Sequence, residues 1–325
     1  MHVVLVIPIF EDWQSAALLC DMIDRTFQKR DSDTVTILLV DDGSFTSDAV
    51  VRQRQDWRAI QTIHILRLRR NLGHQGAIAV GLAYVEHHLP CDAVVVLDGD
   101  GEDLPQGIPV LLARSRETGG IVFAERGRRV EGLRFRLGYL VYRAAHRILT
   151  GRGIHFGNFS AIPFEFVRRL TTMSEFWGHY AAAVINARIP YSTVRLDRGR
   201  RLAGTSRMNL ESLVFHGLAA VAVSQTVGVR ILLASAAVPG LLLLAVLVLA
   251  ALSAASLATI PGWALIWLPA LLVSITAVMS SSLLFVFLSL AFRRLTGVLP
   301  ARDYVHFVER CDLVFVGIGA AASGQ

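Results

Sequence analysis

Four carboxylates gather within six residues directly after an apolar run. The segment "VLDGDGEDLP" starts at Val96 and contains Asp98, Asp100, Glu102 and Asp103. Adjacent carboxylates repel and raise each other's pKa, so a positive partner is expected. In an extended segment alternate residues share a side, which predicts Asp98, Asp100 and Glu102 at steps of roughly 6–7 Å. Three such oxygen ligands suit Mg²⁺ or Mn²⁺ bridging a diphosphate. A solvated acidic turn is the alternative interpretation.

Polar loops follow three further apolar runs. They are residues 8–12 ("PIFED"), 41–44 ("DDGS") and 70–74 ("RNLGH"). Taken singly, Asp-Asp-Gly-Ser is also a common turn and helix start, and Gly73 could simply mark a turn. Together with the acidic segment they place polar residues after four consecutive strands. Ligands of open α/β sheets bind outside the carboxyl ends of the strands, so these loops predict one binding edge.

The elements that must position these loops alternate along the first 110 residues. Apolar runs predict strands at 2–10, 34–44, 60–68 and 92–100, and helical patterns lie at 13–30, 48–58 and 74–89. Strands that alternate with helices favour a parallel, doubly wound α/β sheet. The runs are apolar throughout, as expected for parallel strands that are buried on both faces.

A second region carries no charge. Residues 231–292 contain no Asp, Glu, Lys or Arg, and Pro261-Gly262 divides them into two apolar runs. Each run exceeds the ~20 residues that a helix needs to cross a bilayer. Arg230 and Arg293 flank the pair, so the positive-inside rule predicts a hairpin with both ends in the cytoplasm. A buried hairpin of a soluble core is the alternative. Residues 208–229 predict an interfacial helix along the membrane surface, or a cap on the preceding domain.

Composition excludes several classes of function. The net charge is +6, but no basic stripe interleaved with aromatics appears, which argues against nucleic-acid binding. The three cysteines, Cys20, Cys91 and Cys311, are scattered without metal spacing and read as reduced thiols. Two predicted spans without an intramembrane charge offer no ion path, which argues against a transporter.

The motifs resemble those of a known family. "VIPIFED", "VDDGS", "RNLGHQGAIAVGL", "LDGDGEDLP" and "RRLAGTSR" occur in this order. They are similar to motifs of the family 2 glycosyltransferases of GT-A fold, in particular the dolichol-phosphate-mannose-synthase-like branch with bacterial polyprenyl-phosphate glycosyltransferases. The resemblance implies a Rossmann-like, mostly parallel catalytic domain at 1–207, the interfacial helix at 208–229, two transmembrane helices at 230–292 and a cytoplasmic tail at 293–325.

The resemblance also implies roles for individual residues. A nucleotide would contact Pro8, Phe10, Asp12, Asp41, Asp42, Gly73 and Asp98. The metal ligands would be Asp98, Asp100 and Glu102. The catalytic set would be Asp98, Asp100, Arg126, Arg201, Ser206 and Arg207, with the last three meeting the acceptor phosphate or the leaving diphosphate. Asn158, His179 and Tyr180 are sugar or acceptor contacts, or else ordinary packing and capping residues. Glu102 and Arg207 depart from the family's Gln and Lys.

The implied activity is that of an inverting, metal-dependent hexosyltransferase in the inner membrane. It would move a sugar from a nucleotide-sugar donor to a polyprenyl phosphate, using Mg²⁺ or Mn²⁺. An anionic acceptor needs no general base. A lipid hydroxyl acceptor is the alternative, with Asp103 or Glu125 as the base, and a non-catalytic glycan- or lipid-binding subunit is another. Membrane lipids and a second copy in a homo-oligomer are the expected partners.

Overall fold

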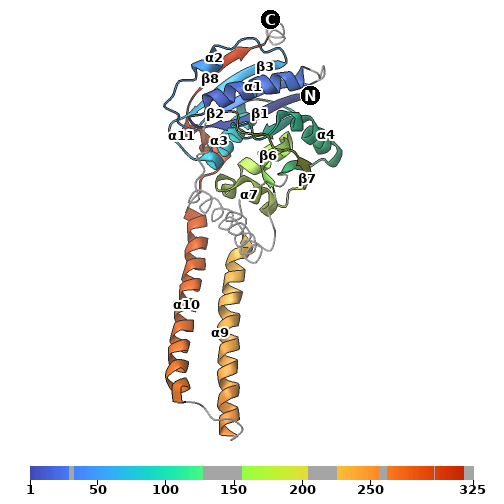
Figure 1. Cartoon of the computed structure of the whole chain (residues 1–325). Helices are drawn as coiled ribbons and strands as arrows, with labels where there is room; N and C mark the ends of the chain where they lie inside the picture. Colours follow the sequence, from blue (N-terminus) through green and yellow to red (C-terminus); the bar gives the residue numbers. More distant parts are fainter. Residues whose placement is uncertain (29–32, 127–155, 204–224, 256–261, 296, 318–325) are drawn as a thin grey trace. The chain divides into compact units, whose positions relative to one another are not determined.

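The computed structural model describes residues 1–28, 33–126, 156–203, 225–255, 262–295 and 297–317 (Figure 1). These residues belong to two compact units. The first contains residues 1–126, 156–203 and 298–317. The second contains two long helices, α9 (Gln225–Ala254) and α10 (Gly262–Leu295).

Within the described residues, the first unit is built on an eight-stranded sheet of order β7-β5-β6-β4-β1-β2-β3-β8. The strands are β1 (His2–Ile9), β2 (Thr34–Asp41), β3 (Ile60–Leu68), β4 (Ala93–Val96), β5 (Ile121–Arg126), β6 (Phe156–Pro163), β7 (Tyr191–Leu196) and β8 (Val308–Val316). Neighbours among β4, β1, β2 and β3 are parallel. The sheet is therefore mostly parallel at its centre, and antiparallel pairs join β6 to β4 and β8 to β3.

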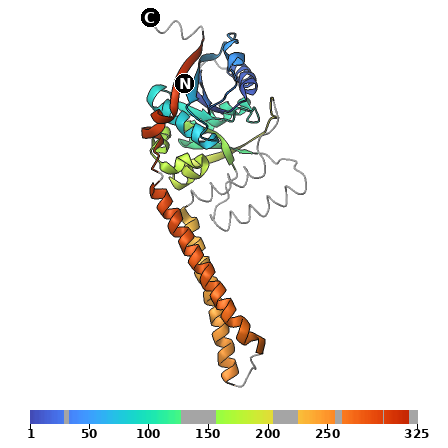
Figure 2. The ribbon, with the colours of Figure 1, turned by 90° about the vertical axis from the view of Figure 1, so that its left-hand side faces the viewer.

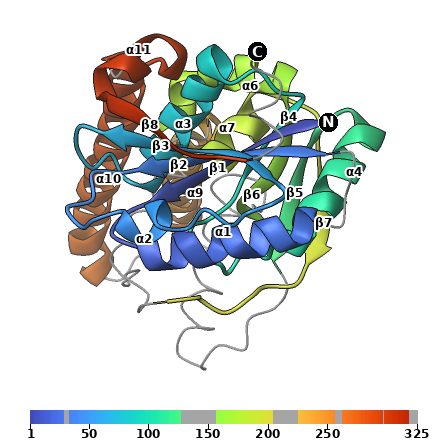
Figure 3. The same ribbon diagram turned by 90° about the horizontal axis from the view of Figure 1, so that it is seen from above.

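Helices cover both faces of the sheet because the central strands are apolar on both sides. Alternate residues of β1 enter two separate hydrophobic clusters. One cluster includes α1 (Trp13–Phe27) and α4 (Ile108–Thr118), and the other includes α3 (His74–His88), α6 (Phe164–Thr171) and α7 (Tyr180–Asn186). Figure 3 shows α1 and α3 on opposite sides of the strands. The predicted α/β architecture is confirmed.

The expected strands and helices of the first 110 residues are all present, but four are shorter than predicted by three residues or more. The strand expected at 92–100 is β4 (Ala93–Val96), and β2 and α1 each end three residues before the predicted bound. The helix expected at 48–58 is α2 (Ala49–Arg52). The Asp24 carboxylate accepts hydrogen bonds from the backbone N–H groups of Arg58 and Ala59, at 2.8 and 2.7 Å. These contacts hold the chain that follows α2 in a non-helical path toward β3.

The segment predicted as a tail contributes to the sheet. A short helix, α11 (Pro300–Phe307), leads into β8. The strand pairs antiparallel with β3 from Thr62↔Val316 to Leu68↔Val308. Figure 3 shows β8 beside β3. The sequence prediction included no strand in this part of the chain.

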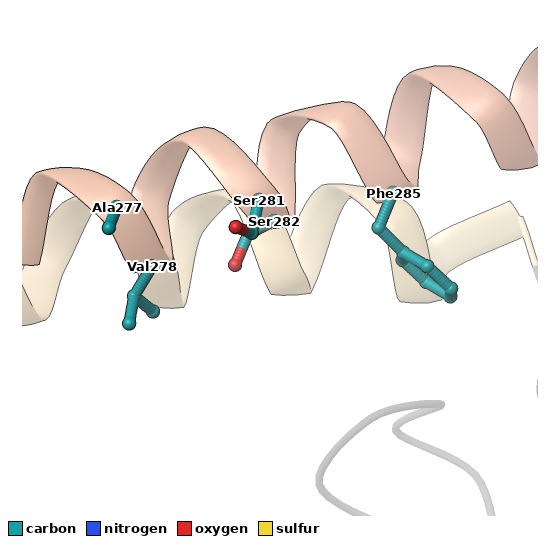
Figure 4. A pocket seen from close by; sticks show the side chains of 5 residues that line it. All are labelled: Ala277, Val278, Ser281, Ser282 and Phe285. Atoms are coloured by element: carbon teal, nitrogen blue, oxygen red, sulfur yellow. The ribbon is translucent and has the colours of Figure 1, made fainter.

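The second unit contains α9 and α10 side by side, as Figures 1 and 2 both show. Large apolar side chains are exposed on both, among them Leu241 at 66% and Phe287 at 69%. Judged over the described residues alone, neither of these helices nor any other has the length and hydropathy to cross a membrane. A shallow concavity of about 390 Å³ is lined by Ala277, Val278, Ser281, Ser282 and Phe285 of α10 (Figure 4).

Candidate active site

The carboxyl ends of four parallel strands meet at one edge of the sheet. The register pairs Ile9 of β1 with Asp41 of β2, and Asp41 with Arg67 of β3. The loops predicted from the sequence follow these strand ends, and they contact one another. The backbone N–H of Leu72 donates to Asp42 Oδ1 at 2.6 Å, which ties the loop after β3 to the end of β2. A Cβ on Gly99 would lie 2.9 Å from the Pro8 carbonyl oxygen, so the turn that follows β4 passes close to the end of β1.

The acidic segment after β4 turns instead of remaining extended, which corrects the sequence prediction. Gly101 has φ +80°, a conformation that favours glycine, and the amide of Glu102 donates to Asp100 Oδ1 at 3.0 Å. The three acids consequently do not share one side as they would in a strand. Within the described residues, no group of three or more His, Cys, Asp or Glu side chains is arranged to hold a metal ion.

Each of these three acids has a different cationic or ionisable neighbour. His74 Nε2 lies 3.1 Å from Asp98 Oδ1, and Arg201 Nη1 lies 3.3 Å from Asp100 Oδ2. Glu102 pairs with Arg198. The positive partners of Asp100 and Glu102 are therefore arginines that lie about 100 residues later in the chain.

The arginine-bearing loop is held against the acidic turn by its backbone. The N–H of Leu202 donates to the Asp100 carbonyl at 2.9 Å, and the N–H of Gly199 donates to the Glu102 carbonyl at 2.8 Å. Arg201 also pairs with Asp12, the residue that precedes α1. The loop at 197–203 thus joins the ends of β1 and β4, and it brings predicted nucleotide, metal and catalytic residues together.

Burial and mutual repulsion govern the charges here. Burial, followed by the nearby charge of Asp98, raises the pKa of Asp100, and Arg201 and Arg198 oppose that rise. Burial alone would lower the pKa of His74, but the carboxylates of Asp98, Asp103 and Asp100 outweigh it and raise that pKa. Two hard oxygen donors at one strand end, with unfavourable mutual repulsion, fit a divalent cation.

The predicted nucleotide residues form the other half of the site. Asp42 is 3% exposed, and burial raises its pKa to about 6. Asp41 is equally buried, and its Oδ1 accepts a hydrogen bond from the Ser44 amide at 2.9 Å. Phe10 is 41% exposed just beyond β1, whereas Pro8 lies within the strand. Gly73 has φ +79° and precedes α3.

A hydrogen-bonded chain next to Asp98 was not predicted from the sequence. Asn158 Nδ2 lies 2.8 Å from His74 Nε2, and Gln75 Nε2 donates to Asn158 Oδ1 at 3.2 Å. Gln75 Oε1 in turn accepts the N–H of Tyr180 at 2.7 Å. The sequence predicts Asn158 as a candidate sugar contact, but it assigns no role to His74 or Gln75 beyond their place in the motif at 70–82. The sequence signal that indicates such a role is the position of these polar residues at the start of a helix that directly follows a strand.

The other two candidate sugar contacts, Tyr180 and His179, have packing and capping contacts within the fold. Tyr180 is fully buried, and its hydroxyl lies 2.7 Å from Ser160 Oγ. His179 precedes α7, and its Nδ1 accepts the N–H of Ala182 at 3.3 Å. Arg126 is the last residue of β5. Ser206 and Arg207, and most of the predicted interfacial helix, lie outside the described residues.

Comparisons with known proteins identify the family of this chain. The family model of glycosyl transferase family 2 matches residues 4–171, just over half of the chain, and the protein belongs to that family. Undecaprenyl-phosphate 4-deoxy-4-formamido-L-arabinose transferases of Salmonella paratyphi B and Salmonella newport are 32% identical over 130 residues. That match spans 39% of this chain and 38% of each relative.

Solved structures give more distant matches. Glucosyl-3-phosphoglycerate synthase from Mycobacterium tuberculosis, in complex with Mn²⁺ and UDP-glucose, is 16% identical. The match covers 68% of this chain and 77% of that one, with a TM-score of 0.48. Staphylococcus aureus TarS 1-349 is 13% identical and covers 60% of this chain and 58% of its own, with a TM-score of 0.38.

Proposed function

We propose that this protein transfers a sugar from a nucleoside-diphosphate sugar to a polyprenyl phosphate, with inversion at the anomeric carbon and with Mg²⁺ or Mn²⁺. One observation carries the proposal. Arg201 bridges Asp12, beside the predicted nucleotide loops, to Asp100 on the predicted metal turn. Family membership supports sugar transfer, and the Salmonella relatives are named as undecaprenyl-phosphate sugar transferases.

Asp98 and Asp100 are the proposed metal ligands. Glu102 becomes a third ligand only when its pair with Arg198 opens. When bound, the cation supplies positive charge against the donor diphosphate. Arg201 adds a planar guanidinium that suits phosphate oxygens, and Ser206 and Arg207 follow it in the same motif. These residues orient the diphosphate and offset the charge that grows on it as it leaves.

The acceptor oxygen requires no base in this scheme. A phosphate monoester is an anion near neutral pH, so its oxygen attacks the anomeric carbon directly from the face opposite the diphosphate. The site contributes position and charge rather than proton transfer. Asp103 is 5% exposed, and its Oδ2 accepts the N–H of Asp98 at 3.1 Å, which favours a structural role over the general base that a hydroxyl acceptor would need.

We also propose, from the sequence of residues 231–292, that this region anchors the protein in the inner membrane, with the catalytic unit in the cytoplasm. The support is the absence of charge from residues 231–292 and the arginines at 230, 293 and 294. Residues 208–229 would lie along the headgroups, close to a lipid phosphate. The protein should stay with membranes in alkaline carbonate. Release of the protein into the supernatant would contradict the proposed membrane anchor, but it would not contradict the proposed sugar transfer.

The reaction is tested by incubating membranes with labelled nucleotide sugars and undecaprenyl phosphate. The expected product is a labelled lipid that mild acid cleaves, because a sugar phosphate linkage to a polyprenyl chain is acid-labile. A lipid product that resists both acid and alkali would indicate a hydroxyl acceptor instead. Absence of transfer from every donor would support a non-catalytic binding subunit.

A further inference from the structure

Arg67, near the end of β3, contacts three carboxylates from three different parts of the chain. Its Nη1 lies 3.0 Å from Asp41 Oδ2, and its Nη2 lies 2.6 Å from Asp48 Oδ2. Its Nε lies 3.6 Å from Asp312 Oδ2 on β8. The Arg67 side chain is 15% exposed and the Asp41 side chain 2%, so this pair is little screened by solvent, whereas the Asp312 side chain is 24% exposed.

Asp312, the residue of β8 that contacts Arg67, is held by further ion pairs. Arg52 Nη2 lies 2.7 Å from Asp312 Oδ2, and Arg52 Nε lies 2.8 Å from Asp48 Oδ2. Arg310, the residue opposite Arg67 in the β3–β8 register, lies 3.3 Å from the same Asp312 oxygen. Three arginines and three aspartates thus form one network, in which Asp312 and Asp48 hold the side of Arg67 that faces away from Asp41.

On its other side the network continues into the predicted nucleotide loops. Asp41 Oδ1 accepts the N–H of Ser44 at 2.9 Å, and Ser44 Oγ accepts the N–H of Glu11 at 2.8 Å. Glu11 has φ +56°, which is costly for a residue with a side chain, and its Oε1 accepts the N–H of Phe45 at 2.6 Å. Arg67 also lies over the Trp13 ring, 5.9 Å from its centroid. Arg67 therefore supports both loops.

We propose that Arg67 and Asp312 are positioning residues for the nucleotide, and that the C-terminal strand β8 sets nucleotide affinity through them. Asp312 acts on the Arg67 guanidinium through the Arg52 and Asp48 contacts, and through its charge at 3.6 Å, which is beyond hydrogen-bond distance. The Arg67 guanidinium holds Asp41, and Asp41 holds the Ser44–Glu11 contact between the two loops. Neither residue touches the transferred sugar in this scheme. The inference rests on the proposed function only in taking residues 10–12 and 41–44 as the nucleotide site.

The test measures the binding of uridine, guanosine and cytidine diphosphates to the full-length protein with Mn²⁺, followed by donor kinetics. For the diphosphate that the wild-type protein binds, Asp312→Asn should raise the dissociation constant about 3–10-fold. The donor KM should rise in parallel, and kcat should stay within about two-fold. The reason is that the substitution weakens binding of the donor equally in the ground state and in the transition state. Asp312→Glu keeps a carboxylate and should recover most of the affinity.

Glu309→Gln is the matched control, because Glu309 lies on the same strand, is half-exposed, and has Arg310 at 3.7 Å. Arg67→Lys supplies a second variant with its charge retained. Combined with Asp312→Asn it should weaken binding by less than the product of the single effects, since both act on one contact.

Equal affinities for Asp312→Asn and Glu309→Gln would overturn the inference and leave the proposed function standing. A fall in kcat with unchanged KM would also overturn it. A wild-type protein that binds none of the three diphosphates would overturn both.

Discussion

Arg201 Nη1 lies 3.3 Å from Asp100 Oδ2, although the two residues are 101 positions apart in the sequence. The same guanidinium pairs with Asp12. The contact brings a residue expected at the phosphates of the substrates beside one expected at the metal. Arg201 therefore serves as the counter-charge of the acidic turn before any substrate arrives, and the same charge is available to the diphosphate.

Replacement of Arg201 by Met should lower kcat about 10²–10³-fold, because the charge on the leaving diphosphate loses its main side-chain partner. Arg201→Lys should be intermediate, since an ammonium keeps the charge but not the two-pronged geometry. Initial rates with the donor found in the transfer assay measure both. Arg195→Met, at an 85% exposed side chain on β7, is the control. An Arg201→Met rate equal to that of this control would contradict the assignment.

Removal of divalent cations should abolish transfer. Saturating chelator is expected to stop turnover, and added Mg²⁺ or Mn²⁺ should restore it. Asp100→Ala should reduce the rate at least about 10²-fold at any metal concentration, because one of the two proposed ligands is gone. Asp56→Ala removes an exposed carboxylate from the same unit and should have no effect. Full activity in chelator would refute the metal role, whatever the result for Asp100.

The pKa of Asp42, raised by burial to about 6, predicts a pH-dependent stability difference. The folded protein binds this proton more tightly than the unfolded chain does. The contribution of Asp42 to stability is therefore fully present below the ordinary Asp pKa and is lost as the pH rises through about 6. Asp42→Asn keeps an acceptor for the Leu72 N–H but cannot ionise.

The variant should therefore be more stable than the wild-type protein at pH 7, by on the order of 1–2 kcal/mol after allowance for solvent screening. At pH 4 the two should be nearly equal. Urea unfolding at both pH values measures the difference. A difference that does not change with pH would show that Asp42 is not the titrating group. Nucleotide affinity should fall in the same variant if Asp42 contacts the base.

The central strands and the site loops could be predicted because their signals are local. Buried parallel strands are apolar throughout, and the polar residues that follow them stand out. The spatial partner of the acidic turn could not be predicted in this way. Residues 197–203 carry no periodicity, and their contacts with Asp100 and Glu102 depend on how the whole sheet folds.

Two different physical effects explain why the sequence pattern does not predict strand β8 or the end of α2. "VERCDLVFV" contains three charged residues among nine, because an edge strand is only partly buried, and only Phe315 reaches full burial. The sequence 48–58 has helical character, but Asp24 takes the N–H groups of Arg58 and Ala59. The sequence pattern also predicts an extended acidic segment, whereas Gly101, at φ +80°, allows this segment to turn.

A pair of glycine substitutions separates backbone strain from loop docking. Gly101 and Gly119 both have positive φ, +80° and +62°. A Cβ at Gly119 would meet nothing within 4 Å, whereas a Cβ at Gly101 would clash with Leu202 in the arginine-bearing loop. Both substitutions by Ala should cost about 1 kcal/mol from the left-handed backbone alone.

Only Gly101→Ala should also reduce transfer, by at least about 10-fold, because a displacement of Leu202 moves Arg201 relative to the acidic turn. Urea unfolding and initial rates, measured on both variants, provide the comparison. Gly119→Ala should keep wild-type kcat despite its lower stability. If the two variants lose stability equally and both retain full activity, the contact between residues 197–203 and the acidic turn is not needed for catalysis, and Arg201 acts from another position.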